Sequence, residues 1–218
     1  MSAPACSVIA FDLDGVLLDA DIHYACLNAA LAPFGTQISR AEHLSTFNGL
    51  PTRVKLALLS DAGRLPNDAH AIVFERKQAL TLDALSHRLD DGDDRNQRLF
   101  IKVRERGLRT AVVTNAVRKT LNAFLAGDGL TDLVNASVAG DEVAHAKPRP
   151  DCYLKTAELL GVSPSQMLAV EDNHHGIEAA RAAGCRVLVV AGPHTFSAAN
   201  VLAAAGISGT TATLTAES

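Results

Sequence analysis

Five short apolar segments alternate along the chain with longer amphipathic ones. The apolar segments consist mainly of aliphatic residues and cover residues 7–11, 108–113, 134–138, 167–170 and 186–190. Their near-continuous hydrophobicity is typical of strands that are covered on both faces, as in a parallel sheet flanked by helices. The amphipathic segments predict helices at residues 95–106, 117–126, 150–161 and 175–183. We therefore predict an α/β fold with a doubly wound parallel sheet.

The interval between the first two predicted strands interrupts this alternation. It contains only helical patterns, with turn signals at Asn48-Gly49 and Pro66 between them. The predicted helices cover residues 20–33, 40–46, 51–60 and 67–87. This pattern indicates a helical insert between the first and second strands of the sheet.

The insert divides the chain into two predicted domains. We expect a helical domain at residues 19–90 and a core domain formed by residues 1–18 and 91–218. The acidic stretch "LDDGDDRN" lies at the second junction. We interpret it as a solvated linker in which Asp93 or Asp94 caps the next helix, in preference to a metal site. Hinges are expected at the two junctions, at residues 18–20 and 89–96.

Composition and charge narrow the classes of partner. The content of 48% hydrophobic and 20% charged residues is ordinary for a globular protein. A net charge of -4 gives no electrostatic footprint for nucleic acid, and there is neither a basic cluster for a membrane surface nor a long apolar run. The four scattered cysteines contain no Cys-x-x-Cys and are expected to be packed thiols. With no signal-peptide pattern, we expect a cytoplasmic protein, a monomer or small homo-oligomer, that binds small molecules.

Polar side chains follow the predicted strands at the points where each strand ends. Because ligands of a parallel sheet collect at the carboxyl ends of its strands, we expect these side chains to share one edge. Four carboxylates and one lysine at such an edge favour a hard divalent cation, and oxygen ligands favour Mg²⁺. The residues concerned are Asp12, Asp14, Thr114, Asn115, Lys147, Glu171 and Asp172.

This combination of groups suits phosphoryl transfer, which depends mainly on positioning and charge neutralisation. An aspartate can accept the phosphoryl group, and a second carboxyl two residues away can protonate the leaving alcohol and then activate water. Each motif alone also has an ordinary interpretation as a turn, a surface lysine or a helix cap. Their occurrence together, in this order, favours one catalytic site.

Four motifs resemble, in order, the signatures of the haloacid dehalogenase superfamily: "FDLDGVLLD", "VVTN", "KPRPD" and "EDNHHGIEAARAAG". The insert resembles the helical cap of the subgroup that includes sugar-phosphate phosphatases, phosphoglycolate phosphatase and β-phosphoglucomutase. The resemblance implies a Rossmann-like core with a cap domain. It also implies that Asp12 is the nucleophile and that Asp14 is the acid/base, with Asp14 giving Mg²⁺ its backbone carbonyl.

The same resemblance implies roles for the other core residues. Thr114 and the Asn115 amide would hold phosphoryl oxygens, and Lys147 would neutralise the nucleophile and the phosphoryl group. Glu171 and Asp172 would complete the metal site with Asp12 and Asp14. Dehalogenases of this family lack the second aspartate of the first motif, so Asp14 favours phosphate chemistry over dehalogenation.

The insert contains candidate substrate contacts. "NGLPTR", with Gly49 and Arg53, resembles the cap loop that meets substrate, and Lys77 follows Arg76 in a basic pair. For the three basic residues a solvated helix face is an equal alternative. His23 lies one position before the histidine of many relatives and is expected to face elsewhere.

The adjacent His174 and His175 are expected to be surface residues in the first turn of a helix. Neighbouring residues on a helix point about 100° apart, and Mg²⁺ prefers oxygen. We therefore exclude them from the predicted metal site.

These observations predict a Mg²⁺-dependent phosphatase acting on a small phosphate monoester, a sugar or polyol phosphate, through an aspartyl phosphate. The alternative is a phosphosugar mutase like β-phosphoglucomutase, which the departures in the insert weaken. A phosphoacceptor signalling domain is less expected, because its phosphorylated aspartate follows a later strand and it carries no helical insert.

Overall fold

The computed structural model describes residues 5–86 and 93–207 of the 218-residue chain. A five-stranded sheet in the order β3-β2-β1-β4-β5 lies at its centre, and all its strand pairs are parallel. The strands are β1 Val8–Phe11, β2 Arg109–Val113, β3 Ala136–Val138, β4 Met167–Glu171 and β5 Arg186–Val189. The prediction of a parallel α/β sheet is confirmed.

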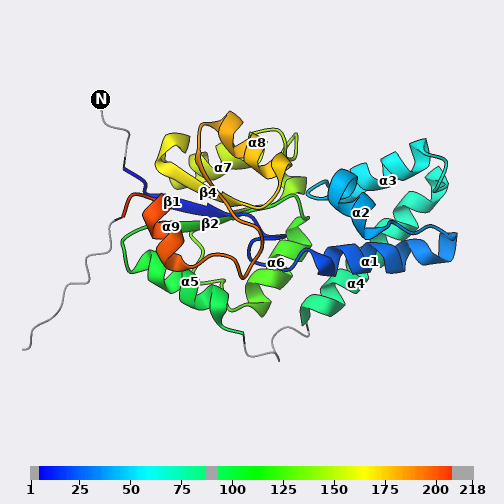
Figure 1. Cartoon of the computed structure of the whole chain (residues 1–218), viewed down its shortest axis with the longest axis horizontal. Helices are drawn as coiled ribbons and strands as arrows, with labels where there is room; N and C mark the ends of the chain where they lie inside the picture. The colour runs from blue at the N-terminus through cyan, green and yellow to red at the C-terminus, as the bar shows by residue number, and fades with distance from the viewer. Residues whose placement is uncertain (1–4, 87–92, 208–218) are drawn as a thin grey trace, which may run out of the picture.

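Helices cover both faces of this sheet (Figure 1). In the view of Figure 1, α7 and α8 lie above the sheet, and α5, α6 and α9 lie below it. The bounds of these helices are α5 Arg95–Arg104, α6 Arg118–Gly127, α7 Asp151–Leu160, α8 His174–Ala183 and α9 Ala198–Ala204.

The alternation of side chains along β1 explains why both faces are covered. Ile9 and Phe11 belong to the cluster on the side of α5 and α6, where the Phe11 ring stacks on Phe100 with centroids 4.9 Å apart. Val8 and Ala10 belong to the opposite cluster, with residues of α7 and α8. All four residues of β1 are fully buried, as expected for a central parallel strand.

Residues 21–86, between β1 and α5, form helices beside the sheet, on the side toward which β1 runs (Figure 1). Their own apolar cluster includes Leu27, Leu56 and Leu59. The Gln78 side-chain amide donates a 3.2 Å hydrogen bond to the Thr120 hydroxyl of α6, which links insert and core. The elements are α1 Asp21–Leu31, α2 Arg40–Glu42, a π-helical turn His43–Phe47, α3 Thr52–Asp61 and α4 His70–Ser86.

The junctions of the insert are described only in part. The predicted boundary after residue 90 and much of the predicted hinge at 89–96 lie outside the described residues, so the domain limits and hinge motion stay predictions. The N-cap residue of α5 is Asp94, whose side chain makes no capping hydrogen bond. The carboxylate of the preceding Asp93 accepts a 2.9 Å hydrogen bond from the backbone N–H of Arg95, the first residue of the helix.

Two further predictions concern the chain as a whole. All four cysteines are free and buried, as expected for packed thiols. None of the helices in the described part of the chain has the length and apolar character needed to span a membrane.

Candidate active site

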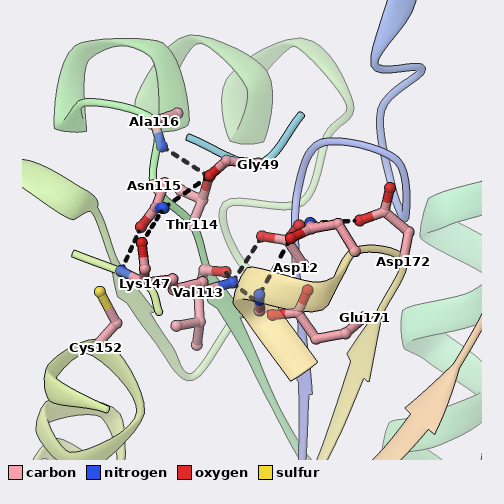
Figure 2. Close-up of polar contacts among 12 residues, drawn as sticks. Asp12, Gly49, Val113, Thr114, Asn115, Ala116, Lys147, Cys152, Glu171 and Asp172 are labelled. Carbon is pink, nitrogen blue, oxygen red and sulfur yellow. Dashed lines mark hydrogen bonds and ion pairs between the residues drawn. The ribbon is translucent and has the colours of Figure 1, made fainter. Parts of the chain in front are cut away.

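The predicted site residues lie at the carboxyl ends of three strands, at one edge of the sheet. Phe11 of β1 is in register with Val112 of β2 and with Val170 of β4. Asp12 and Glu171 directly follow Phe11 and Val170, and Thr114 follows Val112 by two residues, so the three side chains lie at the same edge, as Figure 2 shows. Because neighbouring parallel strands end together, the topology alone explains how groups more than a hundred residues apart in sequence meet here.

Lys147 lies at the centre of this group. Its ammonium donates hydrogen bonds to Asp12 Oδ1 at 2.8 Å, to Glu171 Oε1 at 2.6 Å and to the Val113 carbonyl at 2.7 Å (Figure 2). The side chain is only 3% exposed. Burial acts to lower the pKa of Lys147, but the carboxylates of Asp12 and Glu171 outweigh it and raise the pKa. The ammonium therefore stays charged beside the predicted nucleophile.

Asn115 fixes the loop that carries Lys147. The Asn115 side-chain amide donates to the carbonyls of Lys147, at 3.0 Å, and Gly49, at 2.9 Å, and its oxygen accepts from the Lys147 backbone N–H at 2.9 Å. The side chain thus joins two core loops to the turn before α3 of the insert. The hydroxyl of Thr114 accepts a 3.0 Å hydrogen bond from the Ala116 backbone N–H, which fixes its oxygen at the end of β2.

Asp12, Glu171 and Asp172 form an acidic cluster whose candidate ligand atoms all lie within 4.8 Å of one another. Desolvation and the charge of Asp12 raise the pKa of Glu171 to about 8 and that of Asp172 to about 7. Desolvation also raises the pKa of Asp12. Three oxygen donors that destabilise one another's charge fit a hard divalent cation.

One carboxylate oxygen of Glu171 gives further support for a cation site at this cluster. Glu171 Oε1 accepts hydrogen bonds from Lys147 and from the Tyr153 hydroxyl of α7. Glu171 Oε2 is buried without a hydrogen-bond partner among the described residues. A buried carboxylate oxygen with no partner is costly, and a cation between Glu171, Asp12 and Asp172 would remove that cost.

Glycine backbone packs directly against two of these carboxylates. A Cβ on Gly176, in the first turn of α8, would lie 1.9 Å from Glu171 Oε2. A Cβ on Gly15 would lie 2.0 Å from Asp172 Oδ2, and Gly15 has a φ of +86°, which side chains rarely adopt. Both positions therefore require glycine if the carboxylates are to keep these places.

Asp14 points toward the insert instead of the acidic cluster. Its Oδ1 lies 2.8 Å from His23 Nε2, and His23 Nδ1 lies 2.7 Å from Lys77 Nζ. Because an ammonium only donates, Nδ1 must accept, which puts the hydrogen of a neutral His23 on Nε2, toward Asp14. Burial acts to raise the pKa of Asp14, but His23, Lys77 and Lys55 together lower it.

The prediction that His23 faces elsewhere is wrong. Helix α1 begins at Asp21, so His23 lies in its first turn, where it is 8% exposed and contacts Asp14. Desolvation, opposed by Asp14 and assisted by Lys77, lowers the pKa of His23. The one-residue shift of His23 relative to the histidine of many relatives therefore did not predict the direction of its side chain.

A cavity between core and insert joins these groups. Among the residues that line it are Asp12, Asp14, His23, Gly49, Lys55, Lys77, Thr114, Asn115 and Lys147. Lys77, predicted as a substrate contact, is therefore placed beside the core residues. The acidic cluster adjoins this cavity through Asp12.

Arg53 is not brought to this cavity. It is exposed, its guanidinium lies 4.4 Å from the Phe74 ring centroid, and it lines a neighbouring cavity. Arg76 is likewise exposed. Sequence reasoning missed Lys55, which is 8% exposed and lines the cavity. The spacing of Lys55 with the buried Leu59 on α3 is the signal that could have identified it.

The histidine pair after the acidic cluster lies apart from it. His174 is exposed at the start of α8, His175 is half-buried, and their rings lie 3.7 Å apart between centroids. The cap of this helix is Asn173, whose side-chain oxygen accepts a 3.1 Å hydrogen bond from the Gly176 N–H. Glu171 and Asp172 therefore do not cap the helix and remain free to act as ligands.

Comparison with solved structures supports the fold. CbbY from Rhodobacter sphaeroides in complex with phosphate matches with a TM-score of 0.70 and 27% identity, over 87% of this chain and 88% of that chain. The β-phosphoglucomutase from Clostridium difficile matches with a TM-score of 0.77 over 92% of this chain and 97% of that chain. Its identity of 19% makes this a likeness of fold alone.

Comparison with known sequences extends this likeness. The fructose-1-phosphate phosphatase YqaB of Escherichia coli strain K12 is 34% identical over 176 residues, which cover 80% of this chain and 90% of that protein. The phosphoglycolate phosphatase of Thiobacillus denitrificans is 31% identical over 189 residues, which cover 84% of this chain and 82% of that protein. A family model described as haloacid dehalogenase-like hydrolase matches residues 9–190. The chain therefore belongs to the haloacid dehalogenase-like hydrolase family.

Proposed function

We propose that the protein is a Mg²⁺-dependent phosphatase that hydrolyses a small phosphate monoester, with sugar and polyol phosphates as the expected class. The observation that carries the proposal is the buried Asp12 carboxylate, held by Lys147 beside the acidic cluster and open to the cavity. The relatives named as phosphatases of fructose 1-phosphate and phosphoglycolate support it.

Asp12 is assigned as the nucleophile. Its Oδ1 is bonded to Lys147, so the other carboxylate oxygen attacks phosphorus and forms an aspartyl phosphate. Lys147 offsets negative charge at both the nucleophile and the incoming phosphoryl group. The Thr114 hydroxyl and the backbone N–H of Asn115 hold phosphoryl oxygens, since the Asn115 side chain is already bonded to Gly49 and Lys147.

Asp14 is assigned as the general acid and base. Because His23, Lys77 and Lys55 lower its pKa, Asp14 is a carboxylate in the free protein. It takes up the proton of the phosphate monoester monoanion and passes it to the departing alcohol oxygen. Again a carboxylate, it then takes a proton from the water that attacks the aspartyl phosphate. His23, supported by Lys77, keeps the Asp14 carboxyl turned toward the cavity. The acid and base are thus supplied by the core and oriented by the insert.

The metal site consists of the carboxylates of Asp12, Glu171 and Asp172 with the backbone carbonyl of Asp14. The cluster and the unpartnered Glu171 Oε2 support this assignment. When bound, Mg²⁺ supplies neutralisation of the carboxylate and phosphoryl charges. Tyr153 and Lys147 hold Glu171 in place through its other carboxylate oxygen, Oε1.

Release of inorganic phosphate from p-nitrophenyl phosphate, with Mg²⁺ and with EDTA, tests the proposal. We expect Mg²⁺-dependent turnover that Asp12→Asn abolishes, whereas the matched control Asp61→Asn, at an exposed position of α3, leaves it unchanged. No release across a broad panel of phosphate monoesters would contradict the proposal.

The alternatives give different products in the same experiment. Conversion of a hexose 1-phosphate to its 6-phosphate without loss of phosphate would indicate a mutase. A lasting aspartyl phosphate without turnover would indicate a phosphoacceptor domain.

A further inference from the structure

The insert contributes two buried lysines to the wall of the active-site cavity. Lys55 on α3 is 8% exposed and Lys77 on α4 is 6% exposed, and both line the cavity that contains Asp12 and Asp14. Lysine is almost never this buried unless its charge is paired. The burial of these two charged side chains therefore requires a physical explanation.

The charges that line the cavity do not balance. Among the described residues that line it, the carboxylates are Asp12 and Asp14, and the lysines are Lys55, Lys77 and Lys147. Asp12 is paired with Lys147, and Asp14 is contacted by His23, which in turn contacts Lys77. No hydrogen bond or ion pair reaches the Lys55 ammonium from the part of the chain that the structure describes. Of these three lysines, Lys55 is therefore the one without a hydrogen bond in the described part of the chain, and Asp14 acts on it through charge alone.

Lys55 also has no evident structural purpose. It shares the buried face of α3 with Leu56 and Leu59, where an apolar side chain would pack without carrying a charge. Desolvation and the neighbouring Lys77 lower the pKa of Lys55 to about 8. The charge of Asp14 acts in the opposite direction but does not outweigh them. The ammonium therefore remains mostly charged near neutral pH, at a cost that Asp14 offsets only in part.

We propose that Lys55 is a specificity-determining residue that binds a second anionic group of the substrate, a carboxylate or a second phosphate, while the transferred phosphate lies at Asp12. The inference rests on the proposed function for the position of the transferred phosphate. Within the small phosphate monoesters, it favours phosphorylated acids and bisphosphates over neutral sugar and polyol phosphates. A neutral polyol phosphate would offer the Lys55 ammonium no counter-charge.

Turnover of three probes by the wild-type protein, Lys55→Met and Lys55→Arg tests this inference. Phosphoglycolate carries a carboxylate, fructose 1,6-bisphosphate carries a second phosphate, and glycerol phosphate carries neither. Because a hydrogen bond to a charged group contributes about 1.5–3 kcal/mol, Lys55→Met should lower kcat/KM for the preferred anionic probe about 10- to 100-fold. Because Lys55 also acts on the pKa of Asp14, Lys55→Met affects turnover of every probe. The test is therefore the ratio of kcat/KM for the anionic probe to kcat/KM for glycerol phosphate, which should fall about 10-fold or more.

Two control variants separate charge from packing. Lys55→Arg keeps the positive charge and should retain part of the preference for the anionic probe. Lys102→Met makes the same replacement at an exposed position of α5. It should change turnover of neither the anionic probes nor glycerol phosphate. Which of the two anionic probes loses more activity in Lys55→Met identifies the second group as carboxylate or phosphate.

Binding by calorimetry in the Asp12→Asn background gives a readout that does not depend on turnover. The additional change Lys55→Met should weaken binding of the preferred anionic probe at least tenfold more than it weakens binding of glycerol phosphate. Equal effects on all probes, or a wild-type preference for glycerol phosphate, would overturn the inference while the phosphatase proposal stands. If the wild-type protein releases no phosphate from any probe, but Lys55→Met still selectively weakens binding of the anionic probe, the role of Lys55 is upheld and the phosphatase proposal is rejected.

Discussion

Replacing Lys55 by methionine should make the protein more stable at neutral pH. The fold lowers the pKa of this lysine from its usual 10.5 to about 8, through desolvation and the charge of Lys77. At about 1.4 kcal/mol per pH unit, the buried ammonium costs about 3 kcal/mol relative to the neutral amine. Methionine has a similar length and no charge. We therefore expect Lys55→Met to raise the free energy of unfolding by about 1 to 3 kcal/mol.

The pH dependence of this gain follows from the same pKa. Between the folded value of about 8 and the unfolded value of 10.5, the unfolded chain holds a proton that the folded chain has lost. Over this window the contribution of Lys55 to wild-type stability becomes less unfavourable as pH rises. The advantage of Lys55→Met should therefore be largest at pH below about 8 and shrink toward pH 10.

Urea unfolding without metal, followed by circular dichroism at about pH 7 and pH 10, measures both effects. The matched control Lys102→Met, at an exposed position, should stay within about 0.5 kcal/mol of the wild type. A Lys55→Met variant that is no more stable at neutral pH, or whose advantage does not shrink at high pH, would refute the account of a buried ammonium whose cost is only partly offset.

Further predictions concern the core of the site. Asp12→Asn should abolish turnover, whereas Asp14→Asn should lower kcat about 10²- to 10⁴-fold, and equal mild effects in steady-state assays would contradict the assigned roles. Tyr153→Phe removes the hydroxyl that contacts Glu171 Oε1 and should weaken Mg²⁺ binding about tenfold in a calorimetric titration. Gly176→Ala places a Cβ 1.9 Å from Glu171 Oε2 and should weaken Mg²⁺ binding about 10- to 100-fold, and unchanged affinity would argue against Glu171 as a ligand.

The core of the fold and the meeting of its polar groups could be predicted from the sequence. Short apolar segments such as the one ending at Phe11 marked buried parallel strands, and the rule that ligands collect at strand ends placed Asp12, Thr114 and Glu171 together. These inferences depend on the order of strands and on backbone register, which the sequence pattern reflects directly.

The insert was less predictable because the directions of its side chains depend on how short helices pack. Arg53 and Lys55 are both basic and two residues apart, yet Arg53 is exposed beside Phe74 whereas Lys55 enters the cavity. His23 lies in the first turn of α1, and its contact with Asp14 depends on the placement of that helix against the core. Only the 3.6-residue spacing of Lys55 with its buried neighbours carried this information in the sequence.

The most direct test of the account is to locate the phosphoryl group during turnover. With p-nitrophenyl phosphate the leaving group needs no proton, so Asp14→Asn should still form the aspartyl phosphate but lack the base that hydrolyses it. Rapid acid quench and peptide mapping by mass spectrometry should then find phosphate on Asp12 in this variant, and none when Asp12→Asn is added. Turnover without phosphate on Asp12, or with phosphate on another residue, would contradict the account.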